Sequence, residues 1–128
     1  MVLPSSMRLK GRKCFNHLLR SGKRFHSPSI LLRVVRARPE IMKDPHANNI
    51  KNTCRCAVAI SSKVSKKAVI RNRLRRMLHQ HLRTRLEKEN FRSKYWALIT
   101  IKPSTLNLES KPILDECDKL LTASGLLQ

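Results

Sequence analysis

Residues 62–83 read Ser-Lys-Val-Ser-Lys-Lys-Ala-Val-Ile-Arg-Asn-Arg-Leu-Arg-Arg-Met-Leu-His-Gln-His-Leu-Arg, a strongly basic stretch without a single carboxylate. The stretch nevertheless keeps a helical period. Its apolar face predicts a helix that runs to about Lys88, and Ser65 is expected to cap the first turn through its hydroxyl. That face consists of Ile70, Leu74, Met77, Leu78 and His81.

The opposite side of this helix gathers positive charge. At about 100° per residue, two arginines lie at the edges of the apolar face, Arg71 and Arg73. The centre of the polar side is formed by Asn72, Arg75, Arg76, His79 and Arg83. A solvated helix face normally mixes positive and negative side chains, whereas like charges three or four residues apart oppose helix formation. The pattern therefore favours a polyanion as the partner of this face over simple solvation.

The whole chain carries the same excess of positive charge. Its 128 residues include 28 Lys and Arg against 8 Asp and Glu, a formal net charge of +20. Such an excess opposes compaction by self-repulsion, and a bound nucleic acid is the simplest explanation for it. The length fits a single domain, residues 1–128. No apolar run approaches the ~18 residues of a membrane span, and no secretory signal is evident, so we expect a cytoplasmic protein without a membrane partner.

The cysteines and histidines form no metal or catalytic pattern. Cys54 and Cys56 are separated by one residue, which is closer than the ligands of a zinc knuckle, and we interpret them, with Cys14 and Cys117, as packing thiols. No paired carboxylates, glycine-rich phosphate loop or nucleophile motif is evident. The sequence thus predicts no catalytic residue and no metal ligand.

The remaining segments predict an α+β sandwich in the order α-β-β-(β)-α-β-α. Helices are expected at 11–21 and 110–121, strands at 30–36, 54–61 and 95–101, and a basic turn at 23–28. Residues 1–10 are expected to be a flexible basic N-terminus, and 37–52 a long polar loop. Two antiparallel strands followed by one βαβ unit predict a central, mostly antiparallel sheet with one crossover.

The segment Ala68-Val-Ile-Arg-Asn-Arg-Leu-Arg-Arg76 closely resembles the protein component of bacterial ribonuclease P. That family carries an Arg-Asn-Arg-hydrophobic-[Lys/Arg]-Arg box on the helix that follows its central strands. The resemblance covers roughly residues 7–122 in the right order, including Phe15 and Leu19 on the first helix. Three features depart from the family: Lys66 replaces a common glycine, the loop at 37–52 is longer than usual, and Ile101 stands where relatives often have arginine.

The resemblance implies a ribonucleoprotein endonuclease that removes the 5′ leader from precursor tRNA, with the chemistry carried by the catalytic RNA and its Mg²⁺. It also implies a left-handed βαβ crossover, against the usual hand. Two RNA surfaces would follow. The first is the box and its neighbours, namely Arg71, Asn72, Arg73, Arg75, Arg76, His79, Lys63, Lys66 and Lys67. The second is a cleft for the leader, lined by Phe15, Leu19, Leu31, Arg33, Ala57, Ala59 and Ser61.

Other interpretations stay open on the sequence. Phe15 would equally suit the core side of its helix, and for Leu19 the sequence favours a core position. A structural RNA-binding protein, such as a ribosomal protein, would need the basic helix but would have no use for an aromatic beside a small-residue sheet face. A helix-turn-helix protein would place a second helix just before the basic helix, where the sequence predicts a strand, so we expect no DNA partner.

Overall fold

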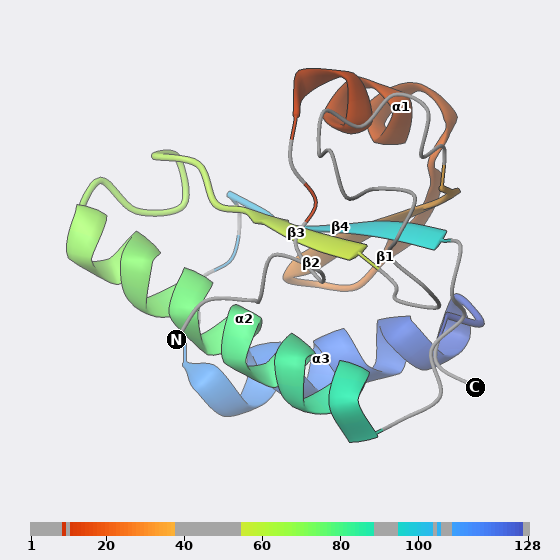
Figure 1. Ribbon diagram of the computed structural model, residues 1–128. Helices are drawn as coiled ribbons and strands as arrows, with labels where there is room; N and C mark the ends of the chain where they lie inside the picture. The colour runs from red at the N-terminus through yellow and green to blue at the C-terminus, as the bar shows by residue number, and fades with distance from the viewer. Residues whose placement is uncertain are drawn as a thin grey trace.

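The computed structural model describes residues 9, 11–37, 55–88, 95–103, 105 and 109–126. Figure 1 shows one layer of strands with α1 on one side and with α2 and α3 on the other. This arrangement confirms the predicted α+β sandwich. In chain order the elements are α1 (Arg12–Ser21), β1 (Lys23–His26), β2 (Ile30–Arg36), β3 (Arg55–Ala59), α2 (Ala68–Lys88), β4 (Tyr95–Ile101) and α3 (Ser110–Ala123).

The four-stranded sheet has the order β1-β2-β4-β3. β2 runs antiparallel to both β1 and β4, whereas β3 runs parallel to β4. The segment β3-α2-β4 is therefore the predicted βαβ crossover, and its hand stays a prediction from the resemblance. The expected flexible segment 1–10 and the loop 37–52 fall almost wholly outside the described residues.

The structure corrects the basic turn predicted at 23–28, because Lys23–His26 forms the edge strand β1. Long-range hydrogen bonds fix the short turn that remains. The Ser27 hydroxyl and the Ser29 amide both donate to Glu116 Oε1 on α3, at 2.6 and 2.7 Å. The Lys102 Nζ donates to the Ser27 carbonyl at 2.7 Å. The same turn is also closed locally, because the Ser27 amide donates to the Ile30 carbonyl at 2.9 Å.

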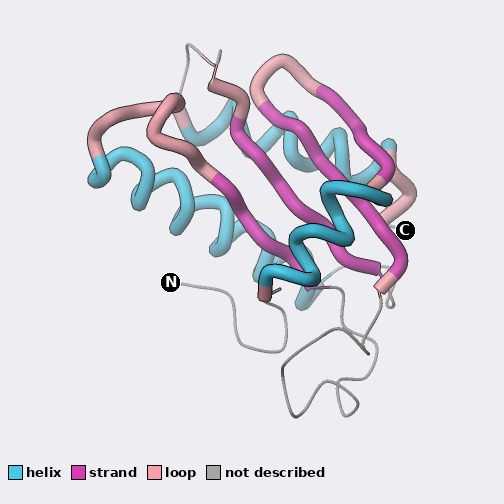
Figure 2. Tube along the Cα trace, turned by 90° about the horizontal axis from the view of Figure 1, so that it is seen from above, coloured by secondary structure: helices cyan, strands magenta, loops and turns pink. Residues whose placement is uncertain are grey.

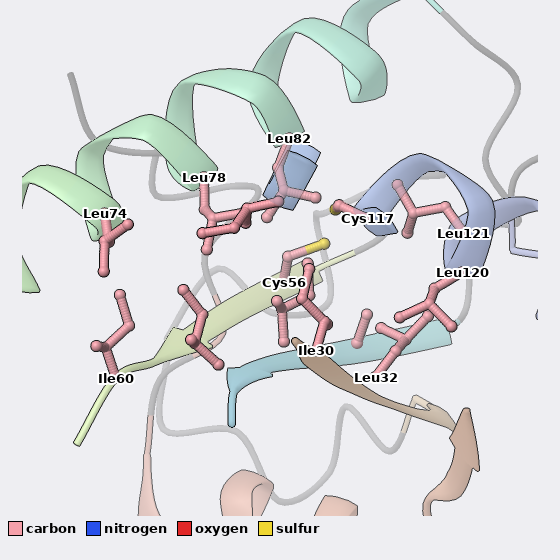
Figure 3. Close-up of a cluster of buried hydrophobic side chains, with 14 of the residues drawn as sticks. Ile30, Leu32, Cys56, Ile60, Leu74, Leu78, Leu82, Cys117, Leu120 and Leu121 are labelled. Atoms are coloured by element: carbon pink, nitrogen blue, oxygen red, sulfur yellow. The ribbon is translucent and has the colours of Figure 1, made fainter. Parts of the chain in front are cut away.

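Each face of the sheet buries its own apolar cluster. On the face covered by α2 and α3, Leu74, Leu78 and Leu82 pack with side chains of α3 and of the strands (Figure 3). On the other face, Cys14 and Leu18 of α1 pack in a second cluster. β4 contributes to both, with Ala97, Ile99 and Ile101 on one side and Trp96 and Leu98 on the other. β4 is therefore a strand buried on both faces.

A glycine follows the last residue of α1, but for a different reason from the usual one. Gly22 has φ −65° and ψ 133°, which any residue can adopt. Its amide donates to the Leu18 carbonyl at 2.9 Å, and a Cβ added at Gly22 would collide with that carbonyl. Close approach of the backbone, rather than a left-handed conformation, therefore requires glycine here.

The described cysteines are packing thiols, as predicted. Cys14, Cys56 and Cys117 are buried, while Cys54 lies outside the described residues. Burial raises the pKa of Cys117 to about 12 and also raises the pKa of Cys14. These thiols remain protonated at neutral pH and behave as small apolar side chains.

A cluster of charged groups joins α2 to α3. Asp118 Oδ1 lies 2.7 Å from His81 Nε2, and Asp118 Oδ2 accepts from Arg85 Nη2 at 2.7 Å. Burial alone would raise the pKa of Asp118, but the hydrogen bonds and positive charge of His81 and Arg85 outweigh it and lower the pKa. A carboxylate whose pKa is lowered by folding stabilises the native state at neutral pH and loses that contribution as the pH falls through the lowered value.

We expect Asp118→Asn to lower the free energy of unfolding at pH 7 by about 1–2 kcal/mol. The loss of stability below about pH 4 should also become shallower than in the unmodified protein. Urea unfolding across this pH range measures both effects. Asp115→Asn is the matched control, since Asp115 is an exposed carboxylate of the same helix. An acid limb as steep in Asp118→Asn as in the unmodified protein would contradict the assignment.

Candidate nucleic-acid interface

The start of α2 is shaped by Ser65, although not as its cap. α2 begins at Ala68, and the Ser65 hydroxyl accepts from the Lys67 amide at 3.2 Å, ahead of the helix. The predicted capping of the first turn is therefore wrong. The Ser65 carbonyl instead accepts from Arg71 Nη1 at 2.9 Å. This bond directs one arginine of the box along the turn that leads into the helix.

Within the box, an uncharged side chain holds an arginine in place. Arg75 Nη1 donates to Asn72 Oδ1 at 2.8 Å, so the asparagine positions an arginine one turn away. Asn72, Arg73 and Arg76 are exposed, and Arg71 and Arg75 are half-buried. Within the described residues, Arg71, Arg75 and Arg76 have no ion pair. Their charge therefore remains for an anion outside the chain.

The turn before α2 adds further cations to this face. Lys63, Lys66 and Lys67 are all exposed between the end of β3 and the first turn of α2. These lysines and the box residues together form a basic surface that we call the basic helix face. It consists of Lys63, Lys66, Lys67, Arg71, Asn72, Arg73, Arg75 and Arg76.

His79 does not belong to that surface. The sequence places His79 on the polar side of α2, whereas the structure buries it to 7% exposure. The reason lies in the apolar row that is actually buried, which is Leu74, Leu78 and Leu82. In an α-helix, a residue four positions further along the chain lies about 40° further around the helix axis. Toward the C-terminal end of α2 the buried side therefore turns toward His79. His79 is therefore poorly placed for a direct contact.

The carboxylates that the structure describes lie in another part of the molecule. Among the residues whose side chains the structure describes, every Asp and Glu lies between 109 and 118, on α3 or directly before it. α3 packs on the side of the sheet away from α1 (Figure 1). The α1 side and the basic helix face thus contain no described carboxylate.

On the α1 side of the sheet, exposure rises from one end of the strands to the other. The cross-strand row Arg55, Trp96 and Val35 is buried. At the opposite end, the row Ala59, Thr100 and Leu31 is half-buried throughout. Figure 2 shows the cause: α1 crosses one end of the sheet and leaves the other strand ends uncovered. We call Ala59, Thr100, Leu31 and the half-buried Arg33 the open strip.

The orientation of α1 turns Phe15 toward the open strip. On one flank of α1, the His17 ring meets Trp96 edge-on at 6.0 Å, and its Nε2 lies 3.3 Å from the Arg36 carbonyl oxygen. Both contacts lie at the covered end of the sheet. Phe15 is about 160° around the helix from His17 and therefore faces the other way. It is half-buried and packs against the same cluster as Ala59.

Most residues of the cleft predicted from the sequence thus lie on one side of the sheet. Phe15, Leu31, Arg33, Ala57 and Ala59 share the α1 side of the sheet, with Ala57 buried as part of the floor. The remaining two lie at its margins: Leu19 is 55% exposed on the flank of α1, and Ser61 is exposed beyond the end of β3. Leu19 is therefore not a core residue.

Sequence reasoning missed one cation on this side, Arg24. It lies opposite Arg33 in the β1–β2 register and is exposed. A turn has no cross-strand register, so the predicted turn at 23–28 gave no reason to place Arg24 opposite Arg33. The alternation of Phe25 with charged neighbours was the available signal, although four residues are a weak basis for a strand.

Neither a metal cluster nor a membrane span is found in the described part of the chain. Within it, no three His, Cys, Asp or Glu side chains are grouped so that they could hold a metal ion. None of the described helices is both long and apolar enough to cross a bilayer.

Comparison of the sequence with protein families and curated proteins gives a consistent result. The family model described as Ribonuclease P matches residues 3–124. The chain is 55% identical over 127 residues to the ribonuclease P protein component of Prochlorococcus marinus strain MIT 9313, covering 99% of each chain. It is 48% identical over 128 residues to that of Parasynechococcus marenigrum strain WH8102, covering 100% of each.

Solved structures share the fold at much lower identity. The RNase P protein of Staphylococcus aureus superposes with a TM-score of 0.75 at 14% identity, over 95% of this chain and 98% of that one. The RNase P protein of Thermotoga maritima gives a TM-score of 0.57 at 16% identity, over 93% and 89%. At these identities the likeness shows the fold alone.

Proposed function

The chain belongs to the bacterial ribonuclease P protein family, and from that premise we propose that it binds the catalytic RNA and the 5′ leader of precursor tRNA. Members of this family are components of an endoribonuclease complex that acts in the 5′ processing of tRNA. The observation that carries the proposal is the presence of two different surfaces. One is the basic helix face, on which Arg71, Arg75 and Arg76 have no ion pair within the described residues, and the other is the open strip beside an aromatic side chain.

The basic helix face is suited to the catalytic RNA. Arginine donates two parallel hydrogen bonds to phosphate oxygens, and Asn72 holds Arg75 in place for such a contact. Lys63, Lys66 and Lys67 extend the positive charge along the turn. Contacts to phosphates fix orientation and register on an RNA without reading its sequence, which suits a subunit that docks on a folded RNA.

The open strip is suited to the single-stranded leader. The small Ala57 and Ala59 let a strand of RNA lie close to the sheet, and Arg33 supplies positive charge. Phe15 at the margin can stack on a base, and stacking accepts any base because every base has a π-face. A subunit that processes many precursors with unrelated leaders requires this tolerance.

The chemistry is assigned to the RNA. Mg²⁺ activates water and stabilises the leaving oxygen in such a cleavage. Within the described residues, no three His, Cys, Asp or Glu side chains are grouped to hold this ion. The role of the protein is to hold substrate and catalytic RNA together, in the cytoplasm.

Reconstitution tests the proposal as a whole. The purified protein is mixed with a ribonuclease P RNA and 5′-labelled precursor tRNA at low Mg²⁺. We expect cleavage at the mature 5′ end only when both protein and RNA are present. Binding without stimulated cleavage would favour a structural RNA-binding protein instead.

We expect replacement of both Arg71 and Arg73 by Ala to weaken binding to the ribonuclease P RNA and to make that binding less dependent on salt. Each lost phosphate contact should reduce the slope of log K against log salt by roughly 0.7–0.9. Filter binding over a range of KCl concentrations measures this slope. Replacement of Lys111 and Lys119 by Ala removes the same charge from α3 and should leave the slope nearly unchanged. An unchanged slope in the arginine variant would contradict the assignment.

We expect Phe15→Ala to lose about 1–3 kcal/mol of affinity for precursor tRNA and none for mature tRNA, because only the precursor has a leader base to stack. Phe15→Leu keeps an apolar side chain in the second cluster and serves as the control for packing. Both variants are assayed in the reconstituted holoenzyme. If precursor and mature tRNA lose affinity equally, Phe15 is a packing residue only.

A further inference from the structure

Two arginines face each other across β1 and β2 without a counter-charge. Arg24 lies directly opposite Arg33 in the antiparallel register, so both side chains are on the α1 side of the sheet. Like charges in directly opposed positions destabilise a sheet. Within the described residues, neither guanidinium has a hydrogen bond or ion pair, and the described carboxylates are all at 109–118.

Arg33 is part of the open strip, and Arg24 lies next to it on β1, on the same face as His26, which is opposite Leu31. The sheet order places β3 at one edge, next to the basic helix face, and β1 at the other edge. Three strand spacings separate these edges, or about 14 Å. Along this path the half-buried Arg33 is followed by the exposed Arg24. An RNA strand that enters beside β3 and passes Arg33, the cation of the open strip, leaves the sheet over Arg24, and His26 lies at the end of the neighbouring row.

We propose that Arg24 and Arg33 together hold one phosphate of the leader, so that Arg24 is a further RNA-binding residue of this protein. The proposal rests on the proposed function, because the leader is the single strand assigned to the open strip. An anion between two opposed guanidinium groups converts their repulsion into attraction. Arginine suits this task because its planar fork donates to two phosphate oxygens at once.

Because of where the pair lies, the contact should depend on the length of the leader. The cleavage point belongs near the catalytic RNA, on the side of the basic helix face, and Arg24 lies at the opposite edge of the sheet. Arg24 therefore meets leader nucleotides far from the cleavage point. A leader too short to cross the strip cannot reach it. A phosphate contact also carries no base preference.

The chain offers a closely matched control in Lys23. It is exposed, adjacent to Arg24 on the same strand, and positively charged, but successive side chains of a strand point to opposite faces. Its Nζ lies 5.5 Å from the centroid of the Phe25 ring, on the face away from α1. Lys23→Ala therefore removes the same charge from the same edge without touching the proposed phosphate site.

The test measures binding of the reconstituted holoenzyme to three RNAs: a precursor with a long leader, a precursor whose leader is truncated to the nucleotide next to the cleavage point, and mature tRNA. We expect Arg24→Ala to weaken binding of the long-leader precursor about tenfold and to leave the other two RNAs unchanged. The salt slope for the long leader should fall by about 0.7. Lys23→Ala should change neither quantity.

A double-mutant cycle tests whether the two arginines share one phosphate. In that case the combined loss in Arg24→Ala with Arg33→Ala is smaller than the product of the single losses. Arg24→Ala should also leave the melting temperature of the free protein unchanged or raised, because it removes a repulsion. A structural role for Arg24 would instead lower that temperature in parallel with the loss of binding.

Two results would overturn the site while leaving the proposed function intact. The first is an equal loss for Arg24→Ala and Lys23→Ala, which would indicate diffuse charge only. The second is an equal loss for all three RNAs, which would place Arg24 against the tRNA body or the catalytic RNA. Failure of the proposed function appears differently, as an unmodified holoenzyme that binds long-leader precursor no better than mature tRNA.

Discussion

The structure depends on β4, a strand with apolar side chains on both of its faces. One face of β4 holds α1 through Trp96 and Leu98, and the other holds α2 and α3 through Ala97, Ile99 and Ile101. A central strand buried on both sides needs neighbours on both edges, and β2 and β3 supply them. Because β3 is parallel to β4, the chain must cross over between them, and α2 is that crossover. The basic helix face is therefore carried by an element that the sheet itself requires.

The two candidate surfaces arise from different physical causes. The basic helix face follows from the amphipathic character of α2, in which one side is buried and the other accumulates arginines. The open strip follows from size, because a helix of 10 residues cannot cover the whole face of a four-stranded sheet. The small side chains of β3 keep the uncovered part shallow, and Arg33 keeps it positive. Among the residues that the structure describes, Arg71, Arg75 and Arg76 of the first surface and Arg33 of the second have no ion pair, which favours binding of RNA.

Sequence reasoning succeeded where local pattern and tertiary packing agree. The alternation in β2 and the apolar run of β4 have their predicted bounds, and the period of α2 gives its predicted end at Lys88. It failed where distant contacts decide. β1 has only a weak local signal, and Glu116 and Lys102 bind its turn from the other end of the chain. His79 is buried because the row ending at Leu82 winds around the helix, a drift that a pattern anchored at Ile70 does not capture. The residues of the open strip could be grouped in advance only through the family resemblance, since no local signal specifies which strands are neighbours.

The buried thiols give the two layers of this fold separate chemical reporters. Cys14 lies in the cluster beneath α1, and Cys117 lies in the cluster beneath α3, where its pKa is raised to about 12. An alkylating or oxidising reagent attacks a thiolate, so neither sulfur reacts until its layer opens to water. The rate of modification at each cysteine then measures how often that layer opens. If α1 lifted away from the sheet and widened the path for RNA, Cys14 would be modified while Cys117 would remain unmodified.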